Sequence, residues 1–201
     1  MEEKNKLKII IIGDSQVGKT SLLFQYTENF YPENFISTVG IEYKLKEIKI
    51  NEVNYTLQIW DTAGQERFKS LSRSFMNEAD GVLFVYDITN KKTFQSIKDW
   101  IKIQEDTSEI GNKKIIVGNK SDLEDKREIS KEKLKNLCEQ LNVYGEETSA
   151  KTGENVSEIF EKLAQLIVED KTRNKTKTKN NVKLKVSDSN DKTKKKKRSF
   201  C

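Results

Sequence analysis

The segment Gly13–Thr20, GDSQVGKT, contains two glycines separated by four residues, then a lysine and a hydroxyl residue. It follows the apolar run Leu7–Ile12, which reads as a buried strand. Successive backbone N–H groups in such a loop cradle an anion, and the next helix presents its positive N-terminus. The pattern predicts a phosphate-binding loop with Lys19 on the β- and γ-phosphates and Thr20 on Mg²⁺, rather than a glycine turn with an ordinary surface lysine. The residues expected to line it are Ser15, Gln16, Val17, Gly18, Lys19, Thr20 and Ser21.

A second group of chemically capable residues lies in WDTAGQERF and ISTVG. Asp61 ends a strand-like run and is expected to hold Mg²⁺ through water, and the Thr38 hydroxyl is expected to complete its coordination. The Gly64 N–H can meet a γ-phosphate, and Gln65 can orient an attacking water molecule. Each of these residues would be unremarkable without the phosphate loop, so the hypothesis depends on their combination.

Two further motifs indicate which nucleotide is bound. Asn119–Asp122, NKSD, follows the strand-like run IIVG, and Thr148–Lys151, TSAK, follows another short strand. A carboxylate at Asp122 can accept hydrogen bonds from the N1–H and N2–H₂ groups of guanine, a donor pair that adenine lacks. The Ala150 N–H can donate to guanine O6. The residues expected around the base are Asn119, Lys120, Asp122, Ser149, Ala150 and Lys151.

These motifs require a sheet that brings its loops to one edge. Apolar runs at 7–12, 82–86 and 115–117 are typical of strands buried on both faces, and amphipathic patterns between them predict helices. The helical patterns include Leu22, Leu23, Tyr26 and Phe30, then Thr93–Thr107, Ser130–Leu141 and a last stripe from Val156 to Ile167. Alternation of this kind indicates βαβ units.

One connection is too short for a crossover. The runs IEYKLKEIKI and VNYTLQIW are separated only by Asn51–Glu52, so these two strands must pair antiparallel. The fold class expected is α/β, with a six-stranded, mainly parallel sheet, one antiparallel edge strand and helices on both faces.

Charge is distributed unevenly along the chain. Residues 171–201 hold 13 of the 37 Lys and Arg residues but only two of the 32 acidic residues, a net charge of +11, whereas residues 1–170 carry −6. The pattern predicts a globular domain over 1–170 and a flexible basic tail over 171–201. Neither a signal peptide nor an eighteen-residue apolar run occurs, which indicates synthesis in the cytosol. Histidine is absent, which excludes imidazole catalysis and His-ligated metals.

The motifs together carry a family resemblance. Over residues 6–170 the chain resembles the small Ras-like GTPases, most closely the Rab branch, through GDSQVGKT, ISTVGIEY, WDTAGQERF, FVYDIT, GNKSD and ETSAK in family order and spacing. The resemblance implies the Ras-like P-loop fold, Mg²⁺-dependent GTP binding, slow hydrolysis to GDP and a switch that recruits effectors in vesicle trafficking. It also implies an exchange factor, an activating protein and a GDP-dissociation inhibitor as partners of a monomer. Tyr31 occupies the family position of an aromatic residue that packs edge-on against guanine.

Aromatic residues mark an expected partner surface. Strand parity places Trp60 on the face opposite Leu57 and Ile59, where it either tucks beneath the following loop or forms a hot spot for partners. Tyr43, Trp60 and Phe75 match the aromatic triad through which Rab proteins meet effectors. Two departures from the family pattern are Gln16, where Gly or Ser is usual, and the stretch FMNEA after the second switch segment.

The terminal segment KKKKRSFC admits three interpretations: a nuclear signal or solvated charge run, a nucleic-acid arm, or a lipid-anchored hook. Cys201 favours the hook, since a prenyl chain beside a basic patch supplies the two signals that stable membrane binding needs. The expected location is the cytosolic face of an intracellular membrane, with cycling to the cytosol. Two rival functions are a P-loop kinase, for which no Arg-rich lid is present, and a nucleic-acid-binding protein, which the acidic globular part disfavours.

Overall fold

The computed structural model describes residues 5–32, 41–62, 77–107 and 112–174 of the 201-residue chain. Its backbone divides into two compact units, Met1–Ile167 and Val168–Cys201. In the second unit the described residues, 168–174, are helical, and Thr172 Oγ1 donates to the Val168 carbonyl at 2.8 Å. The flexible tail was expected to begin at Lys171, but residues 171–174 are helical. The expected domain boundary at residue 170 stays a prediction.

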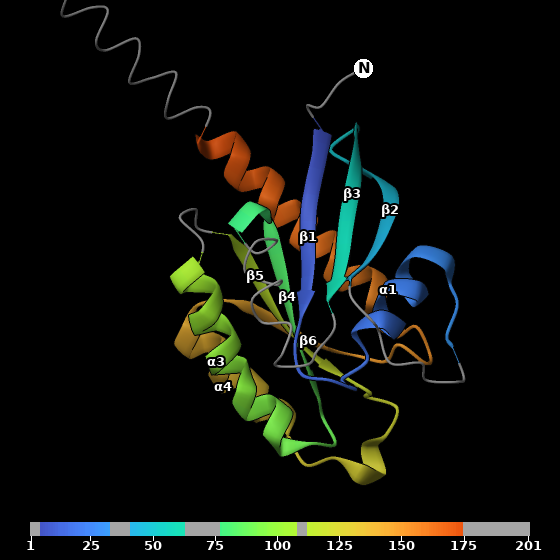
Figure 1. The fold of residues 1–201 in the computed structure, drawn as a ribbon, viewed down its shortest axis with the longest axis vertical. Coiled ribbons are helices and arrows are strands. Elements are labelled where there is room, and N and C mark those ends of the chain that lie inside the picture. The colour runs from blue at the N-terminus through green and yellow to red at the C-terminus, as the bar shows by residue number, and fades with distance from the viewer. Residues whose placement is uncertain (1–4, 33–40, 63–76, 108–111, 175–201) are drawn as a thin grey trace, which may run out of the picture. The chain divides into compact units, whose positions relative to one another are not determined.

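The first unit is built on a six-stranded sheet with strand order β2-β3-β1-β4-β5-β6 (Figure 1). Four neighbouring pairs are parallel, and β2 pairs antiparallel with β3 at one edge. The expected α/β fold is therefore confirmed. The strands are β1 (Lys6–Ile12), β2 (Ile41–Ile50), β3 (Val53–Thr62), β4 (Gly81–Asp87), β5 (Lys113–Asn119) and β6 (Tyr144–Thr148).

The apolar runs became the central strands because they can be covered on both faces. Every residue of β4 is buried, and so are all but the first and third residues of β1. The two-residue connection between β2 and β3 has positive φ at both Asn51 and Glu52, 48° and 63°. Positive φ at both central residues is the geometry of the tight hairpin turn that the short spacing required.

The helices lie close to their predicted positions. They are α1 (Lys19–Glu28), α3 (Lys91–Thr107), the 3₁₀ turn η3 (Glu124–Lys126), α4 (Lys131–Leu141) and a helix over residues 156–174. Phe30 was expected within the first helix, and this was wrong. Asn29 adopts the left-handed conformation, with φ of 51°. The Asn29 N–H donates to the Gln25 carbonyl at 3.1 Å and the Phe30 N–H donates to the Phe24 carbonyl at 3.5 Å, which ends the helix. Phe30 then lies outside it, 54% exposed.

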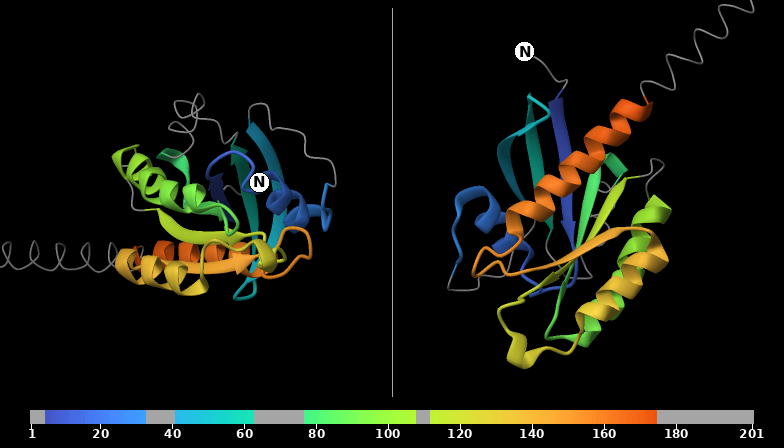
Figure 2. Two further views of the ribbon diagram at one scale, coloured as in Figure 1. Left: turned by 90° about the horizontal axis from the view of Figure 1, so that it is seen from below. Right: turned by 180° about the vertical axis from the view of Figure 1, so that it is seen from behind.

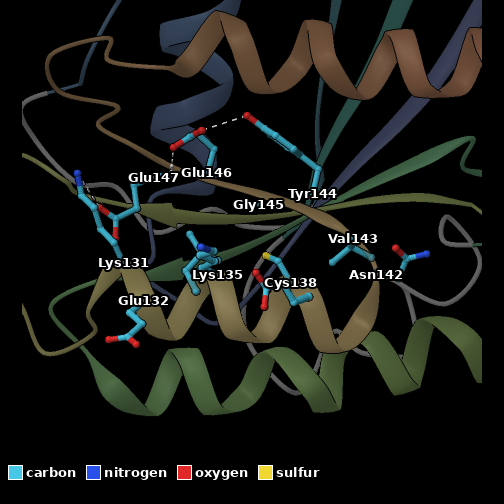
Figure 3. A pocket seen from close by; sticks show the side chains of 12 residues that line it. Lys131, Glu132, Lys135, Cys138, Asn142, Val143, Tyr144, Gly145, Glu146 and Glu147 are labelled. Atoms are coloured by element: carbon cyan, nitrogen blue, oxygen red, sulfur yellow. Dashed lines mark hydrogen bonds and ion pairs between the residues drawn. The ribbon is translucent and has the colours of Figure 1, made fainter.

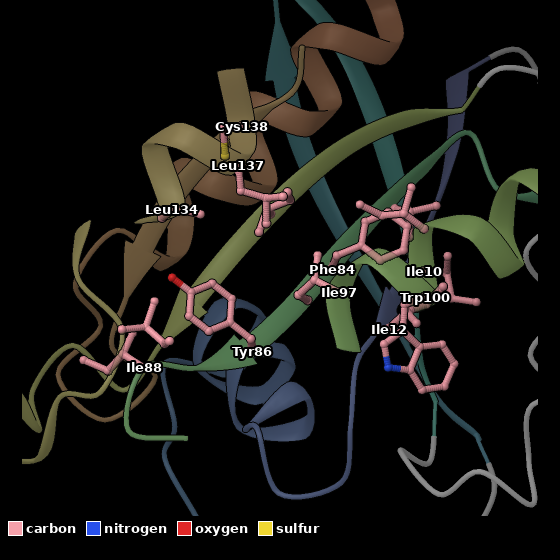
Figure 4. Close-up of a cluster of buried hydrophobic side chains, with 14 of the residues drawn as sticks. Ile10, Ile12, Phe84, Tyr86, Ile88, Ile97, Trp100, Leu134, Leu137 and Cys138 are labelled. Carbon is pink, nitrogen blue, oxygen red and sulfur yellow. The ribbon is translucent and has the colours of Figure 1, made fainter. Parts of the chain in front are cut away.

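Helices cover both faces of the sheet. On one face α1 meets residues 156–167, where the Tyr26 and Phe160 rings stack at 4.2 Å. On the other face α3 and α4 enclose a cluster around Phe84, Tyr86 and Trp100 (Figure 4). Figure 2 shows α3 and residues 156–167 on opposite sides of the sheet. Over the described residues, none of the helices combines the length and apolar composition needed to cross a bilayer.

Candidate functional site

The phosphate loop depends on its glycines for two separate reasons. Gly18 has a φ of 95° and forms the N-cap of α1, and a Cβ there would lie 2.3 Å from the Asn119 amide nitrogen. Gly13, with a φ of 155°, runs so close to β4 that a Cβ would lie 2.1 Å from the Val85 carbonyl oxygen. Any side chain at either position would displace the loop, so both positions require glycine.

The N-terminus of α1 is left available for an anion. Its N-cap makes no side-chain hydrogen bond, and its first turn has no acidic residue. By contrast, α4 is N-capped by Ser130, whose side chain accepts from the Lys133 N–H, and it carries Glu132 in its first turn. The N–H groups at the start of α1 thus lack the side-chain cap that α4 possesses, which suits phosphate binding.

Lys19 lies over this loop. Its Nζ donates to the carbonyls of Gly13 and Asp14 at 2.9 and 2.8 Å, and the residue is 5% exposed. Burial lowers the pKa of Lys19 from 10.5 to about 8, although the nearby charges of Asp61 and Asp14 act in the opposite direction. A phosphate group placed here would favour the protonated ammonium.

Thr20, in the first turn of α1, meets Asp61 near the end of β3. Asp61 pairs with Ile11 in the parallel register of β3 and β1, which brings it beside the loop. The Thr20 hydroxyl donates to Asp61 Oδ2 at 2.5 Å, and Asp61 is fully buried. A hydroxyl and a carboxylate are the hard oxygen donors that Mg²⁺ prefers, so this pair fits the expected metal.

Asn119 connects three segments that are distant in the sequence. Its amide nitrogen donates to the Val17 carbonyl at 2.8 Å, and its Oδ1 accepts from the Ala150 N–H at 3.1 Å and from the Thr148 hydroxyl at 3.3 Å. The residue is 1% exposed. The phosphate loop and both motifs expected at the base are therefore held together through one buried side chain.

The side chains expected around the base also contact one another. The Ser149 hydroxyl donates to Asp122 Oδ1 at 2.6 Å. Lys120 is left-handed, with φ of 72°, and its Nζ bonds to Asp87 Oδ2 at 2.6 Å. Asp87 was not among the predicted site residues. Its position as an acidic residue at the end of the apolar strand β4 could have indicated a role at this edge of the sheet.

A cavity of about 150 Å³ opens between these loops. Eight of its nine lining residues were predicted to bind the nucleotide, and the ninth, Leu123, was not. The lining residues are Gly18, Ser21, Tyr31, Asn119, Lys120, Asp122, Leu123, Ala150 and Lys151. A larger cavity of about 750 Å³ lies between α4 and β6 (Figure 3) and contains no predicted site residue.

Five predicted residues lie outside the described part of the chain: Thr38, Gly64, Gln65, Phe75 and Cys201. Of the aromatic triad, Tyr43 and Trp60 are described. Their rings pack with centroids 4.5 Å apart, and Tyr43 is 39% exposed. Trp60 is partly buried against the cluster under α3, so it both contributes to the core and supports an exposed ring.

Comparison with known proteins places these motifs in context. The model of the Ras family matches residues 8–169. The chain is 44% identical to the Ras-related protein Rab-8B of Homo sapiens over 166 residues, which is 83% of this chain and 80% of that protein. It is also 44% identical to the Ras-related protein Rab-8A of Rattus norvegicus over 158 residues, 79% of this chain and 76% of that protein.

Proposed function

The chain belongs to the Ras family, and from this premise we propose that the loops at the carboxyl edge of its sheet bind GTP and GDP as the two states of a switch. Members of this family are GTPases that hydrolyse GTP to GDP, and the chain is a small GTPase of the Rab branch. Rab proteins act in vesicle trafficking, where GTP-bound forms recruit effectors. The observation that carries the residue assignments is the set of bonds from Asn119 to Val17, Thr148 and Ala150.

In this proposal Asp122 and the Ala150 N–H recognise guanine, while Tyr31 packs against its edge. Lys120 and Lys151 border the base, and Ser149 orients the Asp122 carboxylate, an assignment supported by their 2.6 Å hydrogen bond. The phosphates lie on the backbone N–H groups of Ser15 to Ser21 and on Lys19. The cavity bordered by both groups of residues supports a nucleotide that spans them.

Ras-family GTPases bind their nucleotide together with Mg²⁺. We assign Thr20, Asp61 and Thr38 to this ion, and the 2.5 Å contact between the Thr20 and Asp61 oxygens supports the first two. When bound, the ion would neutralise charge on the β- and γ-phosphates. The Gly64 N–H would contact the γ-phosphate, and Gln65 would orient the water molecule that attacks it.

The switch output is assigned to the surface formed by Tyr43, Trp60 and Phe75, where effectors would dock. Family membership implies regulators and effectors as partners. We assign an exchange factor, an activating protein and a GDP-dissociation inhibitor to this chain. We also propose that the chain is a monomer and does not bind nucleic acid. Rab relatives are membrane-associated, and we propose that a lipid on Cys201 and the basic tail hold this chain on the cytosolic face of an intracellular membrane between periods in the cytosol.

Single-turnover phosphate release from the GTP-loaded protein tests the catalytic assignment. Gln65→Leu should slow hydrolysis by roughly tenfold or more while GTP affinity stays nearly unchanged, because the water molecule loses its positioning partner. The matched control is Gln140→Leu, which replaces an exposed glutamine on α4. This variant should hydrolyse GTP like the unmodified protein. An unchanged rate in Gln65→Leu would remove this residue from the mechanism.

A further inference from the structure

Arg127 lies just after η3 and forms a dense set of hydrogen bonds. Its Nη1 and Nη2 donate to the two carboxylate oxygens of Glu147 at 2.6 and 2.8 Å. Its Nε and Nη2 donate to the carboxylate of Glu124 at 2.9, 2.9 and 2.6 Å, and Nη1 also donates to the Ile129 carbonyl at 2.7 Å. One planar guanidinium therefore binds two carboxylates and a backbone carbonyl, a geometry that a lysine ammonium cannot reproduce.

The two carboxylates belong to the two segments that flank the base cavity. Glu124 lies two residues after Asp122, and Glu147 immediately precedes Thr148 and Ser149. Arg127 thus makes a second connection between the two segments, in addition to the hydrogen bond from Ser149 to Asp122. None of its hydrogen bonds among the described residues reaches the phosphate loop.

Burial makes this connection depend on both partners. The side chains of Arg127 and Glu147 are 13% and 5% exposed, whereas that of Glu124 is 69% exposed. Lys131 Nζ approaches Glu147 only to 4.0 Å and is itself mostly exposed (Figure 3). Removing Arg127 would leave the buried Glu147 carboxylate without a close charged partner. The segment around residues 147–150 would then have to shift so that water could reach this carboxylate.

We infer that Arg127 is a positioning residue for guanine recognition: by binding Glu124 and Glu147 together, it sets the spacing between the Asp122 carboxylate and the Ala150 N–H. This inference rests on the proposed guanine site, and it adds a residue outside the binding motifs. Its effect is specific to the base. Contacts to the phosphates and to Mg²⁺ arise from other segments and should be preserved.

Release rates of GDP and of inosine diphosphate, whose base lacks the N2 amino group, separate positioning from general stability. In Arg127→Met, GDP release should accelerate by about three- to thirtyfold, the range typical of residues coupled to a site without touching its ligand. Inosine diphosphate forms one hydrogen bond fewer to Asp122 and should be affected less. The release rate of inosine diphosphate divided by that of GDP should therefore fall. Far-UV circular dichroism of each GDP-loaded variant checks separately that the fold is kept.

Related variants give a graded expectation. Glu147→Gln should behave like Arg127→Met, while Glu124→Gln should have a smaller effect because Glu124 is exposed. Arg127→Lys should restore part of the discrimination, since it keeps the charge without the fork. Lys126→Met removes an exposed positive charge from the adjacent position and should leave both release rates unchanged. If Arg127→Met does not fold, the release rates of GDP and inosine diphosphate from Arg127→Lys and Glu147→Gln test the inference.

The outcomes distinguish the inference from the function on which it rests. If the unmodified protein itself does not hold GDP more tightly than inosine diphosphate, guanine recognition by Asp122 is contradicted, and the inference with it. If the unmodified protein discriminates and the Arg127 and Glu147 variants keep the same ratio of release rates, the positioning role is overturned while the proposed function stands.

Discussion

At Lys19, burial and nearby charges act on the same ammonium group in opposite directions. Burial prevails and lowers the pKa to about 8. The unfolded chain, with an ordinary lysine, therefore binds more protons than the folded ligand-free protein between pH 8 and 10.5. By linkage, this lysine disfavours folding below pH 8, and its unfavourable contribution is relieved as pH rises from about 8 to 10.5.

Nucleotide binding should reverse this shift, because phosphate oxygens favour the charged ammonium. With a pKa of about 8, roughly three quarters of the ligand-free protein lacks this proton at pH 8.5. We expect GDP binding at pH 8.5 to take up protons and affinity to weaken as pH rises further. Titration calorimetry in buffers of different ionisation enthalpy measures this uptake directly. A binding heat that is the same in every buffer at pH 8.5 would contradict the expected change at Lys19.

Asp122 is the residue on which the choice of base should depend. Asp122→Asn replaces an acceptor by an amide that can also donate, so it should favour xanthosine triphosphate, whose base has a carbonyl where guanine has N2–H₂. GTP affinity should fall by about ten- to a hundredfold, since a hydrogen bond to a charged group contributes about 1.5–3 kcal/mol.

Titrating both nucleotides against the unmodified protein and the variant checks this reversal. Asp125→Asn, an exposed acidic residue of η3, removes the same charge three residues away and should keep the preference for GTP. An Asp122→Asn protein that still prefers GTP as strongly as before would exclude Asp122 from base recognition.

At the scale of elements, the phosphate loop contains two positions that require glycine and one non-glycine residue with a strained backbone. Gly13 and Gly18 satisfy steric demands, but Gln16, also in the loop, has a φ of 68° although it carries a side chain. A left-handed conformation costs a non-glycine residue about 1–2 kcal/mol. Since Gln16 is exposed, contacts of its side chain do little to offset this strain.

Gln16→Gly should therefore stabilise the protein by up to about 1 kcal/mol. Relief of the left-handed conformation exceeds the entropic cost of a glycine, which is about 0.5–1 kcal/mol. The corresponding rise in Tm is about 2–4 °C for a domain of this size. Ser15→Gly is the matched control, because Ser15 is exposed but does not have a positive φ, and it should leave Tm unchanged or lower it. Equal effects of the two substitutions would mean that strain at Gln16 is absent.

At the scale of the whole molecule, the distribution of charge separates the chain into two parts. Residues 171–201 carry a net charge of +11 against −6 for the remainder, and the last residue is a cysteine. Attraction between basic residues and anionic lipid is screened within about 8–10 Å at physiological salt. A basic tail alone would therefore give salt-sensitive binding, whereas a lipid adds anchoring that salt does not remove.

Cys201→Ser should release the protein to the cytosol even though every lysine remains. Replacing Lys194–Arg198 with neutral residues should keep the lipid and weaken retention, with a larger loss as salt rises. Membrane fractionation separates the two defects, and intact-mass measurement of protein from its native cell identifies any modification of Cys201. An unmodified Cys201 on membrane-bound protein would defeat the lipid hypothesis and indicate recruitment by a partner.

The sequence by itself determined the sheet, the family and most of the candidate site. Apolar runs too continuous for one buried face implied central parallel strands, and a two-residue spacing implied the antiparallel pair. Glycine spacing, a terminal carboxylate and short strands ending in polar motifs are local features, so they can be read without a structure. The end of α1 was predicted incorrectly because apolar periodicity was followed to Phe30, although Asn29 is a common helix terminator.

Only the tertiary structure decided which charged groups are buried and what they contact. The sequence shows neither the burial of Lys19, Asp87 and Arg127 nor the groups that they contact, because burial and ion pairing depend on strands and loops that are distant along the chain. The order β2-β3-β1-β4-β5-β6 brings the ends of β1, β3, β5 and β6 to one edge, where Asn119 joins three loops. The same packing brings Glu147 to Arg127, twenty residues earlier in the chain, since long-range proximity arises from the cooperative burial of the sheet rather than from any local pattern.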